Sequence, residues 1–168
     1  VVRLGVARRG DPSIRTYDVV RDNIPITTVD AAYMADDGIA YIKVNRFGRT
    51  TMREFREAMA RMSGAESLIL DLSSNGGGLL DQAVDMAGYF LPGQALVTYI
   101  EGRTVGPEVY RSNVGGEFSG NVVVIIDEAS ASGSEIVAGA LQDWDRAVIV
   151  GDDSFGKGLV QRQIPLGD

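Results

Sequence analysis

The chain has 168 residues, 45% of them apolar, and a formal net charge of −7 from 16 Lys and Arg against 23 Asp and Glu. That length supports one ordinary domain with its own core, and the acidic balance argues against a nucleic-acid partner. The sequence contains neither cysteine nor histidine, which excludes disulfides, thiolate nucleophiles, Cys/His zinc sites and any nucleophile activated by imidazole.

The first 22 residues predict a β-hairpin that is separate from the rest. Apolar residues alternate over residues 1–7, Arg9-Gly10-Asp11-Pro12 is typical of a turn, and residues 14–20 favour a second strand. We interpret residues 1–22 as the trailing edge of a separate unit, residues 23–37 as a polar connector and residues 38–168 as the main domain.

The main domain alternates buried strands with amphipathic helices, which is typical of an α/β domain with helices packed on a sheet. Thr51-x-x-Glu54 is a capping box and predicts the start of the first helix. No apolar run approaches the ~20 residues of a membrane-spanning helix. The expected strands are 38–47, 67–72, two within 96–111, 121–127, 147–150 and 159–166, and the later helices are 79–90 and 132–144.

A glycine-rich segment, Asn75-Gly76-Gly77-Gly78, joins one expected strand to the next helix. Glycines let the backbone approach a ligand closely, and the free N–H groups of a helix start attract anions. The segment is compatible with a phosphate cradle, an oxyanion hole or an ordinary tight turn. It lacks the dinucleotide fingerprint, because Asp81 stands at the third glycine position.

A serine-rich segment, Ser130-Ala131-Ser132-Gly133-Ser134-Glu135, follows a buried strand and begins a helix. Ser132-x-x-Glu135 is itself a capping box, and a serine at a helix start is usually a cap. The alternative is a serine nucleophile on a sharp strand-to-helix turn beside free backbone N–H groups, which would stabilise an oxyanion.

Residues 151–158 contain Lys157, one of only two lysines, between two glycines. The segment nearly matches a P-loop, but Gly158 replaces the magnesium-binding hydroxyl and a strand is expected to follow, so we reject a nucleotide site. Lys157 is then either an exposed structural lysine or a desolvated general base. Because the chain has no histidine, a serine nucleophile needs an unusual base, and a Ser–Lys pair is a known variant.

Taken together, these segments resemble the carboxyl-terminal processing (tail-specific) serine peptidases from about residue 38 to the end. The matching stretches are 68–72 with 75–78, 130–136 with 138–143, and 155–158 with 160–161. The opening hairpin is similar to the trailing strands of the PDZ domain that such enzymes carry. The resemblance implies an α/β fold of the crotonase/Clp-protease type, preceded by a hairpin remnant of a PDZ domain and truncated at its C-terminus.

The resemblance also implies catalytic roles. Ser132 would be the nucleophile and Lys157, 25 positions later, the general base, with Gln161 holding the lysine amine. A lysine base must be neutral, which burial would favour. The amides of Gly78 and Gly133 would be the oxyanion donors.

Other positions depart from the family pattern or have a less defined role. Gly133 stands where the family more often has alanine, and Gly76 where many members have proline. Asp143 occupies a family position as a supporting residue.

By resemblance, the substrates are proteins with flexible apolar C-terminal tails, captured by strand addition to a PDZ domain. The resemblance implies no cofactor or metal, places such enzymes in the bacterial periplasm or cell envelope, and leaves oligomerisation open. Two alternatives remain. One is a catalytically silent peptide-binding module in which Ser132 is only a cap, and the other is an acyl-CoA-processing enzyme of the crotonase type.

Overall fold

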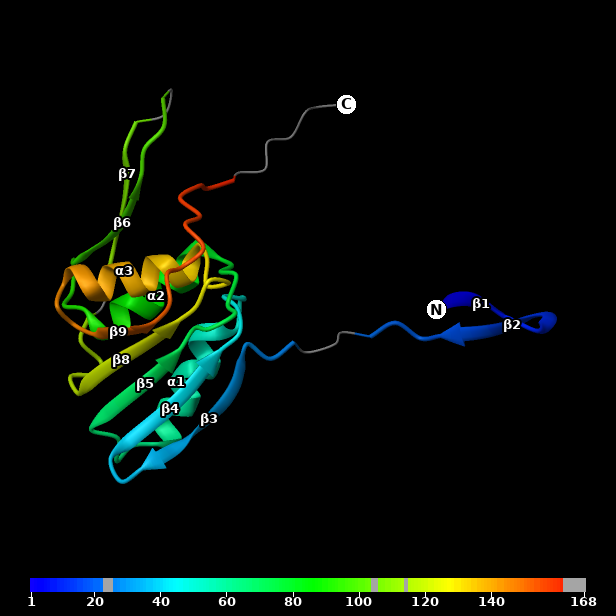
Figure 1. Ribbon diagram of the computed structural model, residues 1–168, viewed down its shortest axis with the longest axis horizontal. Coiled ribbons are helices and arrows are strands. Elements are labelled where there is room, and N and C mark those ends of the chain that lie inside the picture. The colour runs from blue at the N-terminus through cyan, green and yellow to red at the C-terminus, as the bar shows by residue number, and fades with distance from the viewer. Residues whose placement is uncertain (23–25, 104–105, 114, 162–168) are drawn as a thin grey trace.

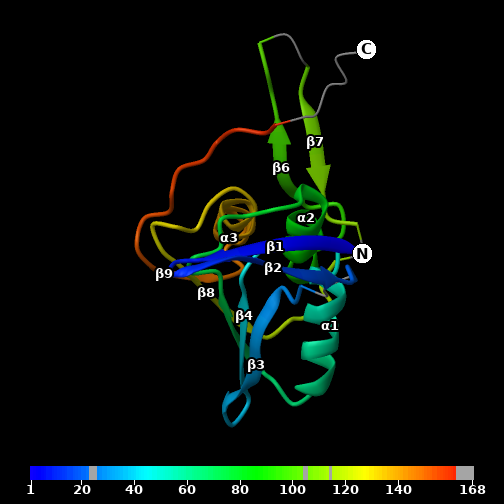
Figure 2. The same cartoon turned by 90° about the vertical axis from the view of Figure 1, so that its right-hand side faces the viewer.

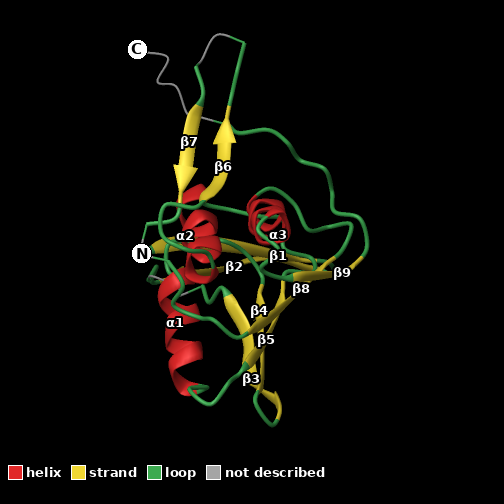
Figure 3. Cartoon of the chain, turned by 90° about the vertical axis from the view of Figure 1, so that its left-hand side faces the viewer, coloured by secondary structure: helices red, strands yellow, loops and turns green. Residues whose placement is uncertain are grey.

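The computed structural model describes residues 1–22, 26–103, 106–113 and 115–161. Its central unit is a five-stranded sheet in the order β3-β4-β5-β8-β9, and three helices lie on one side of it (Figures 1 and 3). The strands are β3 (Val29–Asp36), β4 (Ile39–Val44), β5 (Ser67–Asp71), β8 (Asn121–Ile126) and β9 (Val148–Gly151), and the helices are α1 (Thr51–Arg61), α2 (Leu80–Phe90) and α3 (Gly133–Asp143). The predicted α/β class is confirmed.

The strand directions place the candidate site at one edge of the sheet. Strands β4, β5, β8 and β9 run parallel, and only β3 is antiparallel to its neighbour. The carboxyl ends of parallel strands meet at one edge, where ligand sites of α/β sheets usually form. The glycine segment follows β5 and the serine segment follows the adjacent β8, so the two segments emerge side by side.

The core lies between the sheet and the helices. Ala40, Ile42 and Val44 of β4 are fully buried, and the alternation of a strand therefore points Tyr41 and Lys43 to the opposite face. The helix side of the sheet is closed by a cluster of aromatic rings in edge-to-face contact, made of Phe55, Tyr89, Phe90 and Phe118.

Two hairpins extend from this unit. Strands β1 (Val2–Arg8) and β2 (Asp11–Val19) form the predicted N-terminal hairpin, which lies apart from the sheet and is almost entirely exposed (Figure 1). Strands β6 (Leu96–Ile100) and β7 (Glu108–Arg111) form a second two-stranded sheet that projects beyond α2 and α3 (Figure 2).

Three predicted local features differ from the structure: the connector, the first capping box and the last strand. The connector predicted for 23–37 is wrong over Val29–Asp36, because β3 pairs with β4; this edge strand is largely exposed and so has no clear hydrophobic alternation. The Thr51-x-x-Glu54 capping box is also wrong. The helix begins at Thr51 itself, and the Glu54 carboxylate instead accepts hydrogen bonds from the Thr28 and Val29 N–H groups. Residues 159–161 are not a strand, and the rest of the strand predicted for 159–166 lies outside the described residues.

Candidate active site

A cleft of about 300 Å³ opens at the carboxyl edge of the sheet. Five residues predicted to act together line it: Ser132, Lys157, Gln161, Gly78 and Gly133. The rest of its lining is aliphatic and consists of Leu79, Leu80, Ile136, Leu159 and Val160. The fold therefore gathers into one apolar cleft a hydroxyl, an amine, a carboxamide and two glycine amides from three separate segments.

Ser132 stands on a sharp turn between β8 and α3. Its backbone has φ 57° and ψ −109°, a conformation that non-glycine residues rarely adopt. Such strain persists only where the surroundings impose it, and it is concentrated at functional sites. Its neighbours Ser130 and Ser134 are both fully buried, and their hydroxyls donate hydrogen bonds to the carbonyl oxygens of Leu72 and Asn75. Of the three serines, Ser132 is thus the one presented to the cleft.

The glycine loop, residues Ser73–Leu79, faces this turn and requires glycine at two positions. Gly77 and Gly78 have φ of 93° and 151°. A Cβ on Gly77 would lie 2.7 Å from the Ser132 Cβ, and one on Gly78 would lie 2.1 Å from the Phe47 carbonyl oxygen. Only glycine allows the loop to pass this close to the serine turn and to Phe47.

Asn75 holds the glycine loop in place from within the protein. Its side chain is fully buried, donates to the Val44 carbonyl oxygen at 2.9 Å and accepts from the Gly77 N–H at 2.9 Å. Its own carbonyl oxygen accepts hydrogen bonds from the Ala131 N–H and the Ser134 hydroxyl. This one residue therefore joins the glycine loop to the turn that carries Ser132.

Two backbone N–H groups remain available to a ligand in the cleft. Gly133 is the first residue of α3, where the N–H has no acceptor within the helix. The Phe47 backbone bonds to Gly77 and Leu79 on either side of Gly78, and the described part of the chain shows no hydrogen bond donated by the Gly78 N–H. A pair of preorganised amides beside a hydroxyl is the arrangement that stabilises an oxyanion.

Glu135 links the serine turn to the segment that carries the lysine. Its carboxylate accepts hydrogen bonds from the N–H groups of Ser132 at 2.6 Å, Gly156 at 2.6 Å and Lys157 at 3.0 Å, and from the Ser154 hydroxyl at 2.8 Å. Partial burial alone would raise the pKa of Glu135, but these hydrogen bonds together outweigh it and lower that pKa. The sequence identified Glu135 only as a helix cap, whereas the structure shows that it also fixes the backbone of Lys157.

The side chain of Lys157 is exposed, as is that of Gln161, and no described hydrogen bond joins Lys157 to the Ser132 hydroxyl. The burial expected for Lys157 is therefore not found in this chain. Asp143, also exposed, is the last residue of α3, whereas Ser132 precedes the first. Because a helix rises about 1.5 Å per residue, Asp143 lies at the far end of the helix from the cleft and does not line it.

The other lysine makes a second Ser/Lys pair, which sequence reasoning missed. The Lys43 Nζ donates to the Ser73 Oγ at 2.8 Å and to the Asp71 Oδ2 at 3.2 Å. Lys43 and Asp71 are register partners on the parallel strands β4 and β5, so a correct strand pairing would have revealed this contact. Partial burial favours the neutral acid, but hydrogen bonds from Ser73, Tyr41 and Lys43 hold the pKa of Asp71 below its usual value.

No arrangement of three or more Asp or Glu side chains suited to a metal ion occurs among the residues that the structure describes. Within the same part of the chain, no helix has the length and apolar character needed to cross a bilayer.

Sequence comparison finds relatives that are carboxyl-terminal processing proteases. The chain is 34% identical over 173 residues to one from Synechocystis, which covers 99% of this chain and 40% of that protein. It is 33% identical over 162 residues to one from Bacillus subtilis, covering 95% and 34%. A chloroplastic carboxyl-terminal-processing peptidase of Arabidopsis thaliana is 34% identical over 168 residues, covering 94% and 32%. The chain thus spans about two fifths or less of the length of these relatives.

Solved structures share the fold. A photosystem II D1 C-terminal processing protease superposes with a TM-score of 0.68 at 27% identity, over 89% of this chain and 42% of that one. A Bacteroides fragilis protein described as an S41 protease superposes with a TM-score of 0.64 at 22% identity, over 92% and 46%, which supports the fold alone. The profile of peptidase family S41 matches residues 38–168. The chain belongs to peptidase family S41.

Proposed function

We propose that this chain carries the catalytic site of a serine endopeptidase with Ser132 as nucleophile and Lys157 as general base. The observation that carries the proposal is the strained backbone of Ser132 beside two available amides, in the cleft that Lys157 also lines. A helix cap needs neither the strain nor the second amide. The crotonase-type alternative uses paired amides without a nucleophile, so it leaves the conformation of Ser132 unexplained.

The reaction would proceed by acyl transfer. The Ser132 Oγ attacks the carbonyl carbon of the scissile peptide while its proton moves to the neutral Lys157 amine. The amides of Gly78 and Gly133 stabilise the oxyanion. When the C–N bond breaks, Lys157 returns the proton to the departing amine, and water then hydrolyses the acyl-enzyme by the same route.

The proposed lysine base has to turn toward Ser132 for proton transfer, because no described hydrogen bond joins its amine to the Ser132 hydroxyl and the residue is exposed. Glu135 fixes the Lys157 backbone while leaving the side chain free to turn. Gln161 lines the same cleft and has the carbonyl oxygen needed to orient the amine. A bound peptide that covers the cleft would supply the desolvation that favours a neutral amine.

The proposed substrates are proteins with flexible apolar C-terminal tails, in the periplasm or cell envelope of a bacterium. The aliphatic lining of the cleft supports apolar residues at the cleavage point. We further propose that residues 1–22 are the trailing strands of a PDZ-like domain that captures the tail. Their hairpin bears an exposed apolar stripe on one face, made of Val2, Leu4, Val6, Tyr17 and Val19.

The test is labelling of the chain with a fluorophosphonate, read as intact mass. We expect one adduct on the wild type, mapped to Ser132 by peptide sequencing, and none on Ser132→Ala or Lys157→Ala. Ser73→Ala is the matched control, since it removes the hydroxyl of the other Ser/Lys pair, and it should still be labelled. An unlabelled wild type, or an adduct that persists in Ser132→Ala, would contradict the proposal.

A further inference from the structure

We propose that Lys43, with Tyr41 and Asp71, is a positioning cluster that holds the glycine loop so that the Gly78 amide faces the oxyanion. The inference rests on the proposed function, because it assigns a role in the same reaction to residues that do not line the cleft. It gives the second Ser/Lys pair a purpose other than nucleophilic chemistry.

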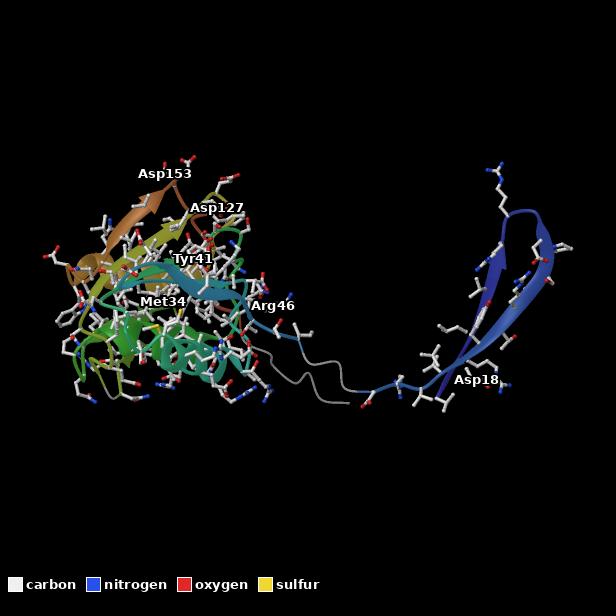
Figure 4. All side chains as sticks on the ribbon, turned by 90° about the horizontal axis from the view of Figure 1, so that it is seen from below. Asp18, Met34, Tyr41, Arg46, Asp127 and Asp153 are labelled. Carbon is white, nitrogen blue, oxygen red and sulfur yellow. The ribbon has the colours of Figure 1, made fainter. Side chains whose placement is uncertain are left out.

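The cluster is built across two strands, on the face of the sheet opposite the helices. The Tyr41 hydroxyl donates to the Asp71 Oδ2 at 2.5 Å, and the other carboxylate oxygen accepts from the Ser73 N–H at 2.8 Å. Lys43 donates to the same carboxylate and to both the hydroxyl and the carbonyl oxygen of Ser73. Figure 4 shows Tyr41 on this face. Ser73, the first residue of the glycine loop, is therefore held through its N–H, its carbonyl and its side chain.

The rest of the glycine loop follows the same strand and its extension. After the Lys43–Ser73 contacts come the bond from Asn75 to the Val44 carbonyl and the bonds between Phe47 and the backbones of Gly77 and Leu79. Residues 43–47 are thus a template along which the loop is laid from its first residue to its last. Lys43 makes the first of these contacts and makes it through its side chain, whereas Val44 and Phe47 contribute backbone groups, so a substitution at Lys43 removes its contact directly.

The geometry assigns positioning and not catalysis to this pair. The Lys43 Nζ donates to three oxygen acceptors, one of them a carboxylate oxygen of Asp71, so its contact with the Ser73 hydroxyl is that of a donor and not that of a base. Burial and the neighbouring Asp71 also raise the pKa of Tyr41 above its ordinary value, so its hydroxyl stays a donor. None of these side chains lines the cleft that Ser132 lines.

The experiment measures the maximal inactivation rate and the apparent affinity of a fluorophosphonate in four variants. Lys43→Met should lower the maximal rate about tenfold with little change in affinity, since a small misplacement of an oxyanion donor weakens the transition state and not the encounter. Lys43→Arg should recover most of the rate, and Tyr41→Phe should lower it about threefold. Arg56→Met on α1, which breaks the ion pair between Arg56 and Glu117, is the matched control and should react like the wild type.

Hydrogen exchange of the Gly77 and Leu79 amides, both of which donate hydrogen bonds in the glycine loop, provides a readout that does not depend on chemistry. It should accelerate in Lys43→Met and stay unchanged in Ser132→Ala and Arg56→Met. A folded Lys43→Met that reacts and exchanges like the wild type overturns the inference and leaves the proposed function standing. If Lys43→Met fails to fold, an unchanged rate and exchange in Tyr41→Phe overturn it instead. An unlabelled wild type overturns the proposed function, while the exchange measurement still tests the coupling of Lys43 to the loop.

Discussion

The two lysines of this chain each accompany a serine, and the two pairs differ in every property that matters for nucleophilic chemistry. Lys43 and Ser73 are in direct contact, with a carboxylate beside them, and neither residue has a positive φ. Lys157 and Ser132 share a cleft without a described hydrogen bond, but that serine has a strained backbone and two glycines, Gly78 and Gly133, line the same cleft. In the pair that is already hydrogen-bonded, the lysine amine donates both to the serine and to a carboxylate.

This difference shows that contact between two reactive side chains is a weak sign of catalysis. The Lys43 amine donates to a carboxylate, a carbonyl and the Ser73 hydroxyl, so this contact positions Ser73 and does not take up its proton. Ser132, in contrast, has a strained backbone and lies beside two N–H groups that have no described acceptor. Such N–H groups can stabilise the negative charge of the transition state more than the ground state. The environment of each pair decides its role.

The largest expected effect separates the two lysines. Lys157→Met should lower the rate of fluorophosphonate labelling by about a thousandfold, the usual contribution of a general base. Lys43→Met should cost no more than about tenfold, because it affects only the position of the glycine loop. Both rates are measured by intact mass against time. Equal losses in the two variants would remove the distinction between a catalytic and a positioning lysine.

The next largest effect concerns the backbone amides of Gly78 and Gly133, which lie beside Ser132 and for which we assign no counterpart to the Lys43–Ser73 pair. Gly78→Ala should lower labelling by about a hundredfold, since its Cβ would displace the loop from Phe47 and with it an oxyanion donor. Gly133→Ala should cost only about threefold, because the amide is kept and the new Cβ would press on the Phe47 ring, at 2.9 Å from Cδ2, and not on backbone. Circular dichroism checks that both variants fold. A larger loss in Gly133→Ala than in Gly78→Ala would contradict this assignment.

Much of this contrast could be predicted from the sequence, because local patterns define it. The strand–turn–helix context of Ser132 and Gly78 follows from short apolar runs and from glycines, whose steric meaning is local. Because the sequence contains no histidine, a serine nucleophile needs another base, and lysine is the known alternative. The five residues predicted to act together do line one cleft, while Asp143, placed by family pattern alone, lies at the other end of its helix.

What could not be predicted depends on contacts between distant segments. The Lys43–Asp71–Ser73 contacts require the register of two parallel strands, which no local pattern specifies. Hydrogen-bond donors from distant segments also contact the first-turn glutamates of α1 and α3, and no local pattern predicts them. The capping box predicted for Ser132 and Glu135 is confirmed, and Glu135 also binds the backbone of Lys157, whereas Glu54 binds the chain entering β3 and caps no helix with Thr51.

Glu135 and Glu54 allow a matched test, with a smaller expected effect, of whether the hydrogen bonds of Glu135 support the Ser132 and Lys157 site. Glu135→Gln should lower the labelling rate about tenfold, because one carboxylate oxygen is replaced by a donor and the Lys157 backbone is held less firmly. Glu54→Gln makes the same chemical change in the first turn of α1, at a residue that does not line the cleft, so it should lower thermal stability and leave the rate unchanged. A comparable rate loss in both variants would mean that Glu135 acts only through global stability.

The smallest effect is on stability and its dependence on pH. The folded pKa of Asp71 is below its unfolded value, so the stability it contributes is present above the unfolded pKa and is lost as pH falls through the folded one. At neutral pH, urea unfolding should find Lys43→Met less stable than the wild type by about 1–2 kcal/mol, the worth of a hydrogen bond to a charged group. That difference should shrink as the pH falls below the ordinary pKa of an aspartate, about 4, and through the lower pKa of Asp71 in the folded protein.

Lys157→Met should show no such trend, because none of the described ion pairs includes Lys157. A pH-independent deficit in Lys43→Met would mean that its methylenes, and not its charge, stabilise the cluster. The same deficit in Lys157→Met would show that the exposed lysine is held by an interaction of comparable strength, and the two pairs would then differ less than their environments indicate.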